Sequence, residues 1–264
     1  MSVFSIEVLL VLLGLAILLV AAFLVVPAIL SISAGVTVNY FRGISSGVTL
    51  QWVFQVWELY AGTILLSFVV AFATLVLTLV AGVPAAYALH VRGGRLSRII
   101  EEVITLPLAI PGLAIALALL FTYQGFGDFR RSWLFILTGH VIYTMPFMVR
   151  SVMAVFATID IKTLDEGAAS LGATPWRRFR DVIVPNAVPG ILAGSLMVVT
   201  LSLGEFNLTW MLHTPLTKTL PIGLADSYAS MRLEVASAYT LIFFVMIIPL
   251  LVAMQMFADQ EQKR

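Results

Sequence analysis

Residues 59–89 read LYAGTILLSFVVAFATLVLTLVAGVPAAYAL and contain no charged side chain. A helix needs about 20 consecutive apolar residues to cross the hydrocarbon core of a bilayer, so this stretch alone is long enough to span a membrane. Soluble domains are usually about 25% charged, whereas this 264-residue chain is 61% hydrophobic and only 11% charged. The chain is therefore predicted to be an integral membrane protein.

Five further stretches of the chain are equally poor in charge, and together they leave little room for an independent soluble domain. The spans that we predict lie at residues 7–30, 63–89, 103–121, 133–157, 187–208 and 236–257. The predicted fold class is all-α: a polytopic membrane protein of about six transmembrane helices, in which residues 1–264 form a single domain. The first span is interpreted as retained, because a secretory signal has a basic start and a shorter apolar core.

Basic residues are distributed unequally between the loops on the two sides. Lysine and arginine near helix ends are retained on the cytoplasmic side of a membrane. The richer set of loops and tails holds nine of them, namely Arg92, Arg95, Arg98, Lys162, Arg177, Arg178, Arg180, Lys263 and Arg264. The poorer set holds five, namely Arg42, Arg130, Arg131, Lys218 and Arg232. Both termini and the loop 159–186 are therefore predicted to be cytoplasmic.

Several classes of function are excluded by what the sequence lacks. With no cysteine, there is no thiolate metal site and no thiol nucleophile. A net charge of +1 gives no basic footprint for nucleic acid. No Gly-x-x-x-x-Gly-Lys-Ser/Thr loop is present to cradle phosphates, and His90, His140 and His213 form no His-Glu-x-x-His pair. We therefore expect no catalytic residue, no metal site and no ATP hydrolysis by this chain alone.

The loop after the fourth predicted span begins with signals for a short helix. Thr163 and Glu166 have the spacing of a capping box, in which each residue bonds the backbone amide of the other, so the helix is expected to start at Leu164. Gly172 is the residue type that tolerates the left-handed conformation that closes a helix. The spacing predicts a helix of about two turns.

A second helix is predicted to follow directly. Thr174 and Pro175 have the pattern of an N-cap residue followed by proline at the first helical position, and Pro185 is expected to end this helix. Its apolar face consists of Trp176, Phe179, Val182 and Ile183. Residues 163–185 therefore form two short helices joined at a glycine, and we call this segment the elbow.

Charged residues gather on the elbow. Arg177, Arg178 and Arg180 project away from the apolar face, and Asp165 and Glu166 lie in the preceding helix. Basic residues on an interfacial helix often meet lipid headgroups. Two capped helices with a glycine between them are more structure than a lipid anchor requires, so docking of a cytoplasmic partner is the favoured interpretation.

The run EGAASLGATPWRRFRDVIVP at residues 166–185 resembles the EAA loop of ABC importer permeases. That pattern is Glu-Ala-Ala, three residues, Gly, and a closing aliphatic-x-aliphatic-Pro, and Gly167 in place of the first alanine is the one departure. The resemblance implies a type I importer permease fold. It also implies that the elbow is the coupling helix, which sits in a groove on the ATP-hydrolysing subunit, with Glu166, Ala168 and Gly172 at contact and hinge positions.

The resemblance further implies the partners of the chain. The expected partners are two ATPase subunits that carry ATP and Mg, a second permease that is either related or identical, a periplasmic or lipid-anchored solute-binding protein, and membrane lipid, with no nucleic acid. The expected location is the bacterial inner membrane. The residues expected to couple to the ATPase, all within the loop 159–186, are Thr163, Asp165, Glu166, Ala168, Gly172, Ala173, Pro175, Arg177 and Arg178.

The resemblance extends over nearly the whole chain, including Leu106–Gly112 and Leu203–Phe206. Within the superfamily, the chain is most similar to permeases of the spermidine/putrescine, iron(III), phosphonate and thiamine group. Sugar-type permeases share a segment like Thr219–Leu224 but typically have Trp-Asn-Glu-Phe where this chain has Leu-Gly-Glu-Phe, so they rank second. A third possibility, from another functional class, is a channel or membrane scaffold that works without ATP.

Polar residues within and beside the spans are candidates for the solute path. His140 lies inside the fourth span, and such a ring either lines a path or bridges packed helices. Glu205 and Asn207 lie at the end of the fifth span. An ionised carboxyl group at that position raises the free energy of the folded protein unless it is paired, hydrated or functional. Glu205 is therefore either a ligand for a cationic solute or a bonding partner for Asn207, Thr209 or an arginine on a neighbouring helix.

The segment from Thr209 to Val235 is long for a connection between helices. In the family that the chain resembles, this region meets the solute-binding protein, which makes His213, Lys218 and Pro221 candidate contacts. The alternative is a plain loop that packs on its own helices. Substrate identity is not determined by these residues.

Overall fold

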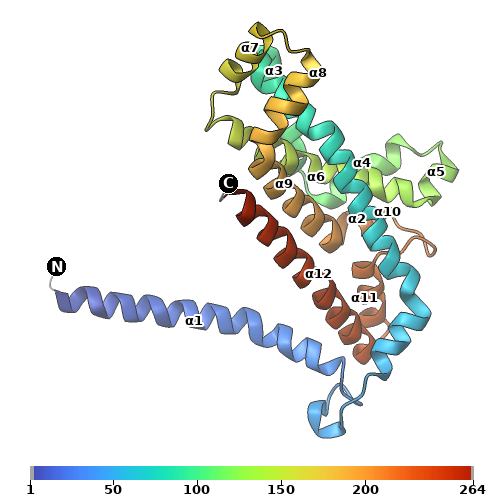
Figure 1. The fold of residues 1–264 in the computed structure, drawn as a ribbon. Helices are drawn as coiled ribbons and strands as arrows, with labels where there is room; N and C mark the ends of the chain where they lie inside the picture. Colours follow the sequence, from blue (N-terminus) through green and yellow to red (C-terminus); the bar gives the residue numbers. More distant parts are fainter. Residues whose placement is uncertain (1–2, 263–264) are drawn as a thin grey trace. The chain divides into compact units, whose positions relative to one another are not determined.

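The computed structural model describes the backbone of residues 3–262, with side chains for residue 8 and residues 10–256. Over that range the chain is helical, and its only β pairing is an isolated bridge between Thr37 and Val48 (Figure 1). The helices are α1 (Val3–Ala34), η1 (Gly43–Ser46), α2 (Gln51–Arg92), α3 (Gly94–Thr105), η2 (Leu106–Ala109), α4 (Gly112–Thr122), α5 (Gly127–Arg131), α6 (Trp133–Phe156), α7 (Ile161–Ser170), α8 (Pro175–Arg177), η3 (Arg178–Ile183), α9 (Val184–Gly204), α10 (Asn207–Leu212), α11 (Leu220–Ala229) and α12 (Leu233–Gln262).

Five helical segments among the described residues are long and apolar enough to cross a bilayer. They are Leu10–Ala34, Gln51–Arg92, Trp133–Phe156, Pro175–Gly204 and Leu233–Met256. A sixth span is available if Gly94–Ala109 and Gly112–Thr122 are counted together. The prediction of an all-α polytopic protein with about six spans is confirmed.

The third predicted span, 103–121, is broken into two helical pieces. The two helical pieces in this region meet at an angle of 111°. Ile110 is extended, with φ −102° and ψ 129°, and Pro111 follows it with ψ 139°. Proline disfavours helical geometry in the residue before it and has no amide hydrogen to donate, so the chain bends here.

The second and fifth predicted spans differ from the structure at their ends. α2 begins at Gln51 rather than at residue 63, and it is kinked at Tyr60, whose φ of −132° is not helical. α9 ends at Gly204 rather than at residue 208, because Glu205 is extended with ψ 120°. The hydropathy pattern therefore predicts where these helices lie in the sequence. The residues at which they end depend on the backbone angles of single residues, which hydropathy does not report.

The chain divides into two compact units, each described here by itself. The first comprises residues 1–61 and 224–245. In it, Gly35 lies against the backbone of Ser237, so that a Cβ on Gly35 would be 2.6 Å from the Ser237 carbonyl carbon. The Glu234 carboxylate accepts a hydrogen bond from the Tyr40 amide at 2.9 Å. These contacts join the start of α12 to the chain that follows α1.

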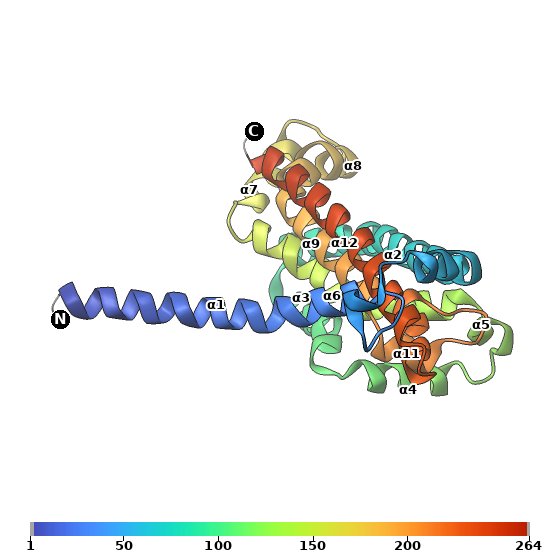
Figure 2. The same cartoon turned by 90° about the horizontal axis from the view of Figure 1, so that it is seen from below.

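The second unit comprises residues 62–223 and 246–264, and α6 and α9 run side by side in it (Figures 1 and 2). Gly190 and Gly194 are four residues apart on α9, the spacing that lets membrane helices approach closely. A Cβ on Gly190 would lie 2.6 Å from the Ser151 carbonyl oxygen, and one on Gly194 would lie 2.9 Å from Met148 Sδ. The absence of side chains at these two positions sets the distance between the two helices.

Gly190→Ala should separate α6 and α9, because the added methyl group would clash with the Ser151 carbonyl oxygen, a backbone atom that cannot rotate away. We expect a loss of about 1–2 kcal/mol in unfolding free energy, typical of an overpacked core, measured by thermal unfolding of the purified protein in detergent. Gly62→Ala is the matched control, since nothing lies within 4 Å of its added Cβ. Equal stability of the two variants would contradict the close-packing argument.

Candidate functional site

The first helix of the elbow starts earlier than predicted. α7 begins at Ile161, and its N-cap is Asp160, whose carboxylate accepts from the Thr163 amide at 3.2 Å and from Thr163 Oγ1 at 2.6 Å. The predicted capping box of Thr163 and Glu166 is therefore wrong, because a carboxylate near the helix N-terminus is the stronger acceptor for Thr163. The signal that sequence reasoning missed was an aspartate three residues before the threonine.

The end of the first helix and the start of the second are as predicted. Gly172 has φ +81°. Its amide bonds the Ala169 carbonyl at 2.9 Å, and the Ala173 amide bonds the Ala168 carbonyl at 3.1 Å, which is the Schellman pattern of a helix C-terminus. Thr174 Oγ1 then accepts from the Arg177 amide, with Pro175 at the first helical position. The glycine joint of the elbow is confirmed.

Pro185 does not end the second helix, which is a correction. α8, the π-helical turn η3 and α9 form one continuous helical run from Pro175 to Gly204. A π-turn has wider i→i+5 spacing, which coincides here with the missing amide of Pro185. Asn186 Nδ2 donates to the Val182 carbonyl at 2.7 Å, so this side chain satisfies a backbone acceptor beside the irregular turn.

The predicted coupling residues divide into an outward and an inward face. Glu166, with a side chain 67% exposed, faces outward together with the exposed apolar residues Leu171 and Trp176. Asp165 is only 5% exposed. Its Oδ2 accepts from Arg178 Nη1 at 2.7 Å and its Oδ1 accepts from the Tyr87 hydroxyl of α2 at 2.6 Å.

The remaining predicted coupling residues follow the same division. Those that are exposed are Thr163, Gly172, Pro175 and Arg177, and those that are half-buried are Ala168, Ala173 and Arg178. The elbow is anchored within the second unit by Ile183, and α7 by Ile161 at its start; both are fully buried in the same apolar cluster as Phe156 of α6. The elbow therefore has one face packed on the membrane helices and another that is free.

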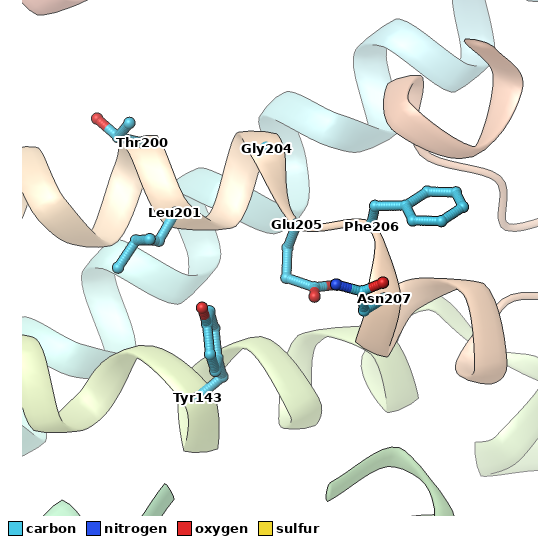
Figure 3. Close-up of a pocket in the computed structure, with 7 residues that line it drawn as sticks. All are labelled: Tyr143, Thr200, Leu201, Gly204, Glu205, Phe206 and Asn207. Carbon is cyan, nitrogen blue, oxygen red and sulfur yellow. The ribbon is translucent and has the colours of Figure 1, made fainter. Parts of the chain in front are cut away.

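A polar cavity of about 220 Å³ lies where α9 ends. Its lining residues are Tyr143, Thr200, Leu201, Gly204, Glu205, Phe206 and Asn207 (Figure 3). Two of the three predicted path residues, Glu205 and Asn207, are in this lining, and Tyr143 reaches it from α6. Among the residues whose side chains are described, no group of three His, Asp or Glu residues could hold a metal ion.

The Glu205 carboxylate is occupied by bonds to the start of α10. Oε1 accepts from the Leu208 amide at 2.9 Å, and Oε2 accepts from the Thr209 amide at 2.8 Å and from Thr209 Oγ1 at 2.9 Å. A carboxylate at this position satisfies backbone donors that a helix start leaves unpaired. The geometry therefore places Glu205 in the structural role that bonds Thr209.

His140 is a bridge between helices and is not in the cavity lining. It is buried, and its Nδ1 lies 2.8 Å from Ser202 Oγ and its Nε2 lies 2.8 Å from Thr209 Oγ1. Because the single hydroxyl hydrogen of Thr209 goes to Glu205, Thr209 Oγ1 accepts from His140 Nε2–H. A chain of hydrogen bonds thus runs from Ser202 through His140 and Thr209 to Glu205, and it joins α6, α9 and α10.

The long segment after α9 is mostly helical, which differs from the expected loop. It contains α10, α11 and the connection 213–219. His213, Lys218 and Pro221 are half-buried, and His213 Nδ1 lies 3.0 Å from the Trp210 carbonyl oxygen. Leu216, in the same connection, is 94% exposed. The binding-protein contact stays a prediction.

The fold is shared with ABC transporters of known structure. The chain aligns with a chain of a bacterial ABC transporter involved in the import of the acidic polysaccharide alginate, at a TM-score of 0.73 and 16% identity over 96% of both chains. It aligns with a chain of the MetNI methionine ABC transporter at a TM-score of 0.61 and 18% identity, over 78% of this chain and 95% of the other. These likenesses define the fold class as that of an ABC transporter permease.

The family follows from the sequence comparison. Residues 79–261 match the family described as binding-protein-dependent transport system inner membrane component, and this protein belongs to that family. It is a multi-pass inner-membrane permease of an ABC importer. The chain is 26% identical to the putative 2-aminoethylphosphonate transport system permease protein PhnV of Salmonella typhimurium over 86% of this chain and 81% of the relative. It is 28% identical to the molybdenum transport system permease protein ModB of Azotobacter vinelandii, over 75% and 93% of the two chains.

Loss of the Asp160 cap should loosen the first turn of α7. Hydrogen bonds from the Thr163 side chain and then its backbone lower the pKa of Asp160 below its ordinary value, so the cap is complete above that ordinary value and is lost as the pH falls through the lowered pKa. For Asp160→Ala at neutral pH we expect amide hydrogen exchange over residues 161–164 to rise about threefold or more, measured by mass spectrometry. Asp181→Ala, an exposed acid of the same elbow, should leave that exchange unchanged.

Thr209→Val removes the hydroxyl that joins His140 to Glu205 while preserving the shape of the side chain. His140 Nε2–H is then buried without its acceptor, which should lower the unfolding free energy by about 1–3 kcal/mol. The control is Thr138→Val on α6, whose hydroxyl bonds the Leu134 carbonyl of its own helix. Thermal unfolding in detergent that ranks the control as the less stable variant would refute the hydrogen-bonded chain.

Proposed function

We propose that this permease is driven by a separate ATP-hydrolysing subunit that docks on the elbow, and that it imports a small anionic solute of the phosphonate or oxyanion type. The observation that carries the proposal is the free face of the elbow. Leu171 and Trp176 are 90% and 66% exposed beside the charges of Glu166 and Arg177. An exposed apolar patch rimmed by charged residues is typical of a protein contact.

The rigidity of the elbow supports the same role. Each end of its first helix is closed, by Asp160 and by the Gly172 joint, and its second helix continues into α9 without a break. A push on the free face is therefore passed along a helix into α9. The basic residues of the loop 159–186 favour a cytoplasmic elbow and cytoplasmic termini, where an ATPase with its ATP and Mg would be found.

The solute class is proposed from the cavity and from the relatives together. Tyr143 offers a hydroxyl group and Asn207 offers an amide. The Thr200 hydroxyl already donates to the Leu196 carbonyl at 2.7 Å, and the one carboxylate in the lining, that of Glu205, already accepts three hydrogen bonds. Neutral donors of this kind suit a hydrogen-bond acceptor such as a phosphonate better than a polyamine or a metal cation. The names of PhnV and ModB refer to 2-aminoethylphosphonate and molybdenum, which agrees with this choice.

A complete importer requires more chains than this one. We propose a second permease, a pair of ATPase subunits and a solute-binding protein as partners, as the family resemblance implies. A sugar-type substrate has less support, since the alginate transporter shares only the fold at 16% identity. An ATP-independent channel has less support, since the matching family is described as a binding-protein-dependent transport system component.

Glu166→Arg and Gly172→Val test the elbow as the docking site. The first reverses an exposed charge, and the second forces a branched side chain into a backbone conformation with φ +81°, which costs about 1–3 kcal/mol. Each should reduce retention of the ATPase subunit on the purified permease about tenfold or more, together with ATP-dependent uptake of radiolabelled 2-aminoethylphosphonate or molybdate into proteoliposomes.

The control for charge reversal is Glu102→Arg on α3, which is also exposed but lies outside the elbow. It should retain the ATPase subunit at the level of the unmodified protein. Full ATPase retention by both elbow variants would overturn the docking assignment. Uptake that proceeds with no ATP and no ATPase subunit would instead favour the channel.

A further inference from the structure

We propose that Asp165 is a positioning residue that locks the elbow to α2, so that movement of the elbow is passed to α2 as well as to the helices that adjoin it in sequence. This inference rests on the proposed function, because it concerns how the docked ATPase moves the membrane helices. It assigns to Asp165 a role opposite to the one expected from its place in the docking loop, since its side chain faces the protein and not the partner.

The two carboxylate oxygens of Asp165 hold two different segments. Oδ1 accepts from the Tyr87 hydroxyl of α2 at 2.6 Å, and Oδ2 accepts from Arg178 Nη1 of η3 at 2.7 Å. Asp165 itself belongs to α7, and its side chain is 7% exposed. Hydrogen bonds to an ionised carboxylate are about twice as strong as neutral ones, so this one side chain ties both helices of the elbow to α2, whose Tyr87 is 78 residues away in the chain.

An aromatic contact supports the same joint. The rings of Tyr87 and Phe179 have centroids 5.6 Å apart, and Phe179 is in turn 6.0 Å from Trp176. The Tyr87 hydroxyl is therefore directed at Asp165 by a ring that is packed against the second helix of the elbow. Both halves of the elbow meet α2 at this one tyrosine.

Chain connectivity explains why α2 needs such a joint. α6 leads into α7 through residues 157–160, and η3 continues into α9, so these two long helices must follow the elbow through the backbone. α2 has no backbone connection to the elbow. Movement of the elbow therefore reaches α2 through side-chain contacts. The Asp165–Tyr87 hydrogen bond is such a contact between α7 and α2, and it is shielded from water.

Other ion pairs in or beside the elbow lack these features. Lys162 and Glu166 are 3.9 Å apart with side chains 65% and 67% exposed, and Arg180 and Asp181 are 3.7 Å apart with side chains 72% and 59% exposed. Exposed pairs of this kind hold little structure in water. The Asp165–Arg178 pair is shorter, at 2.7 Å, and its side chains are only 7% and 20% exposed, so water competes less for this ion pair.

The joint can be tested on the purified permease without any partner. The chain has no cysteine, so spin labels at Arg92→Cys and Ser170→Cys report the distance between the end of α2 and the end of α7 without background. Tyr87→Phe removes only the hydroxyl and should broaden this distance distribution about twofold. Tyr123→Phe, at a half-buried tyrosine directly after α4, is the matched control and should leave it unchanged.

Asp165→Ala is a second variant that releases both bonds and should broaden the distribution further. If Asp165→Ala fails to fold, Tyr87→Phe alone decides the matter. A distribution that is the same in Tyr87→Phe and in the unmodified protein would overturn the proposed joint, whatever the outcome for ATPase docking.

The transmission of movement is tested in the complex with its ATPase subunits in proteoliposomes. The readout is the rate at which Leu201→Cys, in the cavity lining, reacts with a charged methanethiosulfonate reagent with and without ATP and vanadate. In Tyr87→Phe we expect ATPase retention and hydrolysis within about twofold of the unmodified protein, while the nucleotide-dependent change in labelling rate falls about fivefold or more.

A full labelling response in Tyr87→Phe would overturn the inference and leave the proposed function standing. A cavity that shows no response to nucleotide even in the unmodified complex would count against the proposed function itself. Loss of ATPase retention in Tyr87→Phe would mean that Tyr87 supports the docking face rather than transmission, which also overturns the inference.

Discussion

The structure depends on one constraint, which is that backbone amides and carbonyls in the hydrocarbon core must find partners within the protein. Most of the chain meets it with uninterrupted helices. At three interruptions the local chemistry compensates. Pro111 removes a donor at the bend before α4, the Asn186 side chain bonds the Val182 carbonyl beside the π-turn, and the Glu205 carboxylate takes the amides at the start of α10. At two of these breaks, therefore, a side chain takes the place of a helical hydrogen bond.

The candidate functional features coincide with these breaks. The cavity opens where α9 stops at Gly204, because the extended Glu205 turns the chain and leaves space beside Tyr143. The free face of the elbow lies between the end of α6 and the π-turn that leads into α9. The long α9 therefore joins the proposed docking face at one end to the polar cavity at the other, and close packing on α6 through Gly190 and Gly194 keeps the path between them stiff.

Buried polar groups take two different roles in this protein. The chain through Ser202, His140, Thr209 and Glu205 uses its members as partners for one another, so it holds α6, α9 and α10 together and leaves little capacity to bind a solute. Asp165 instead connects α2 to an elbow that is proposed to move. A residue that the sequence suggests as a binding residue can therefore instead hold helices together. Its hydrogen-bond partners decide which of these two roles it has.

The sequence by itself determined the features that follow from local rules: the number of apolar spans, the glycine joint at Gly172 and the Thr174–Pro175 restart, since helix ends and bilayer spans depend on a few neighbouring residues. It did not determine that Asp160 outcompetes the Thr163–Glu166 pair, that the third span bends by 111°, or that Asp165 points inward to Tyr87. Tertiary structure alone decided the Asp165 pairing and the bridging role of His140, because the groups that satisfy them lie tens of residues away in the chain and come near only when the helices pack.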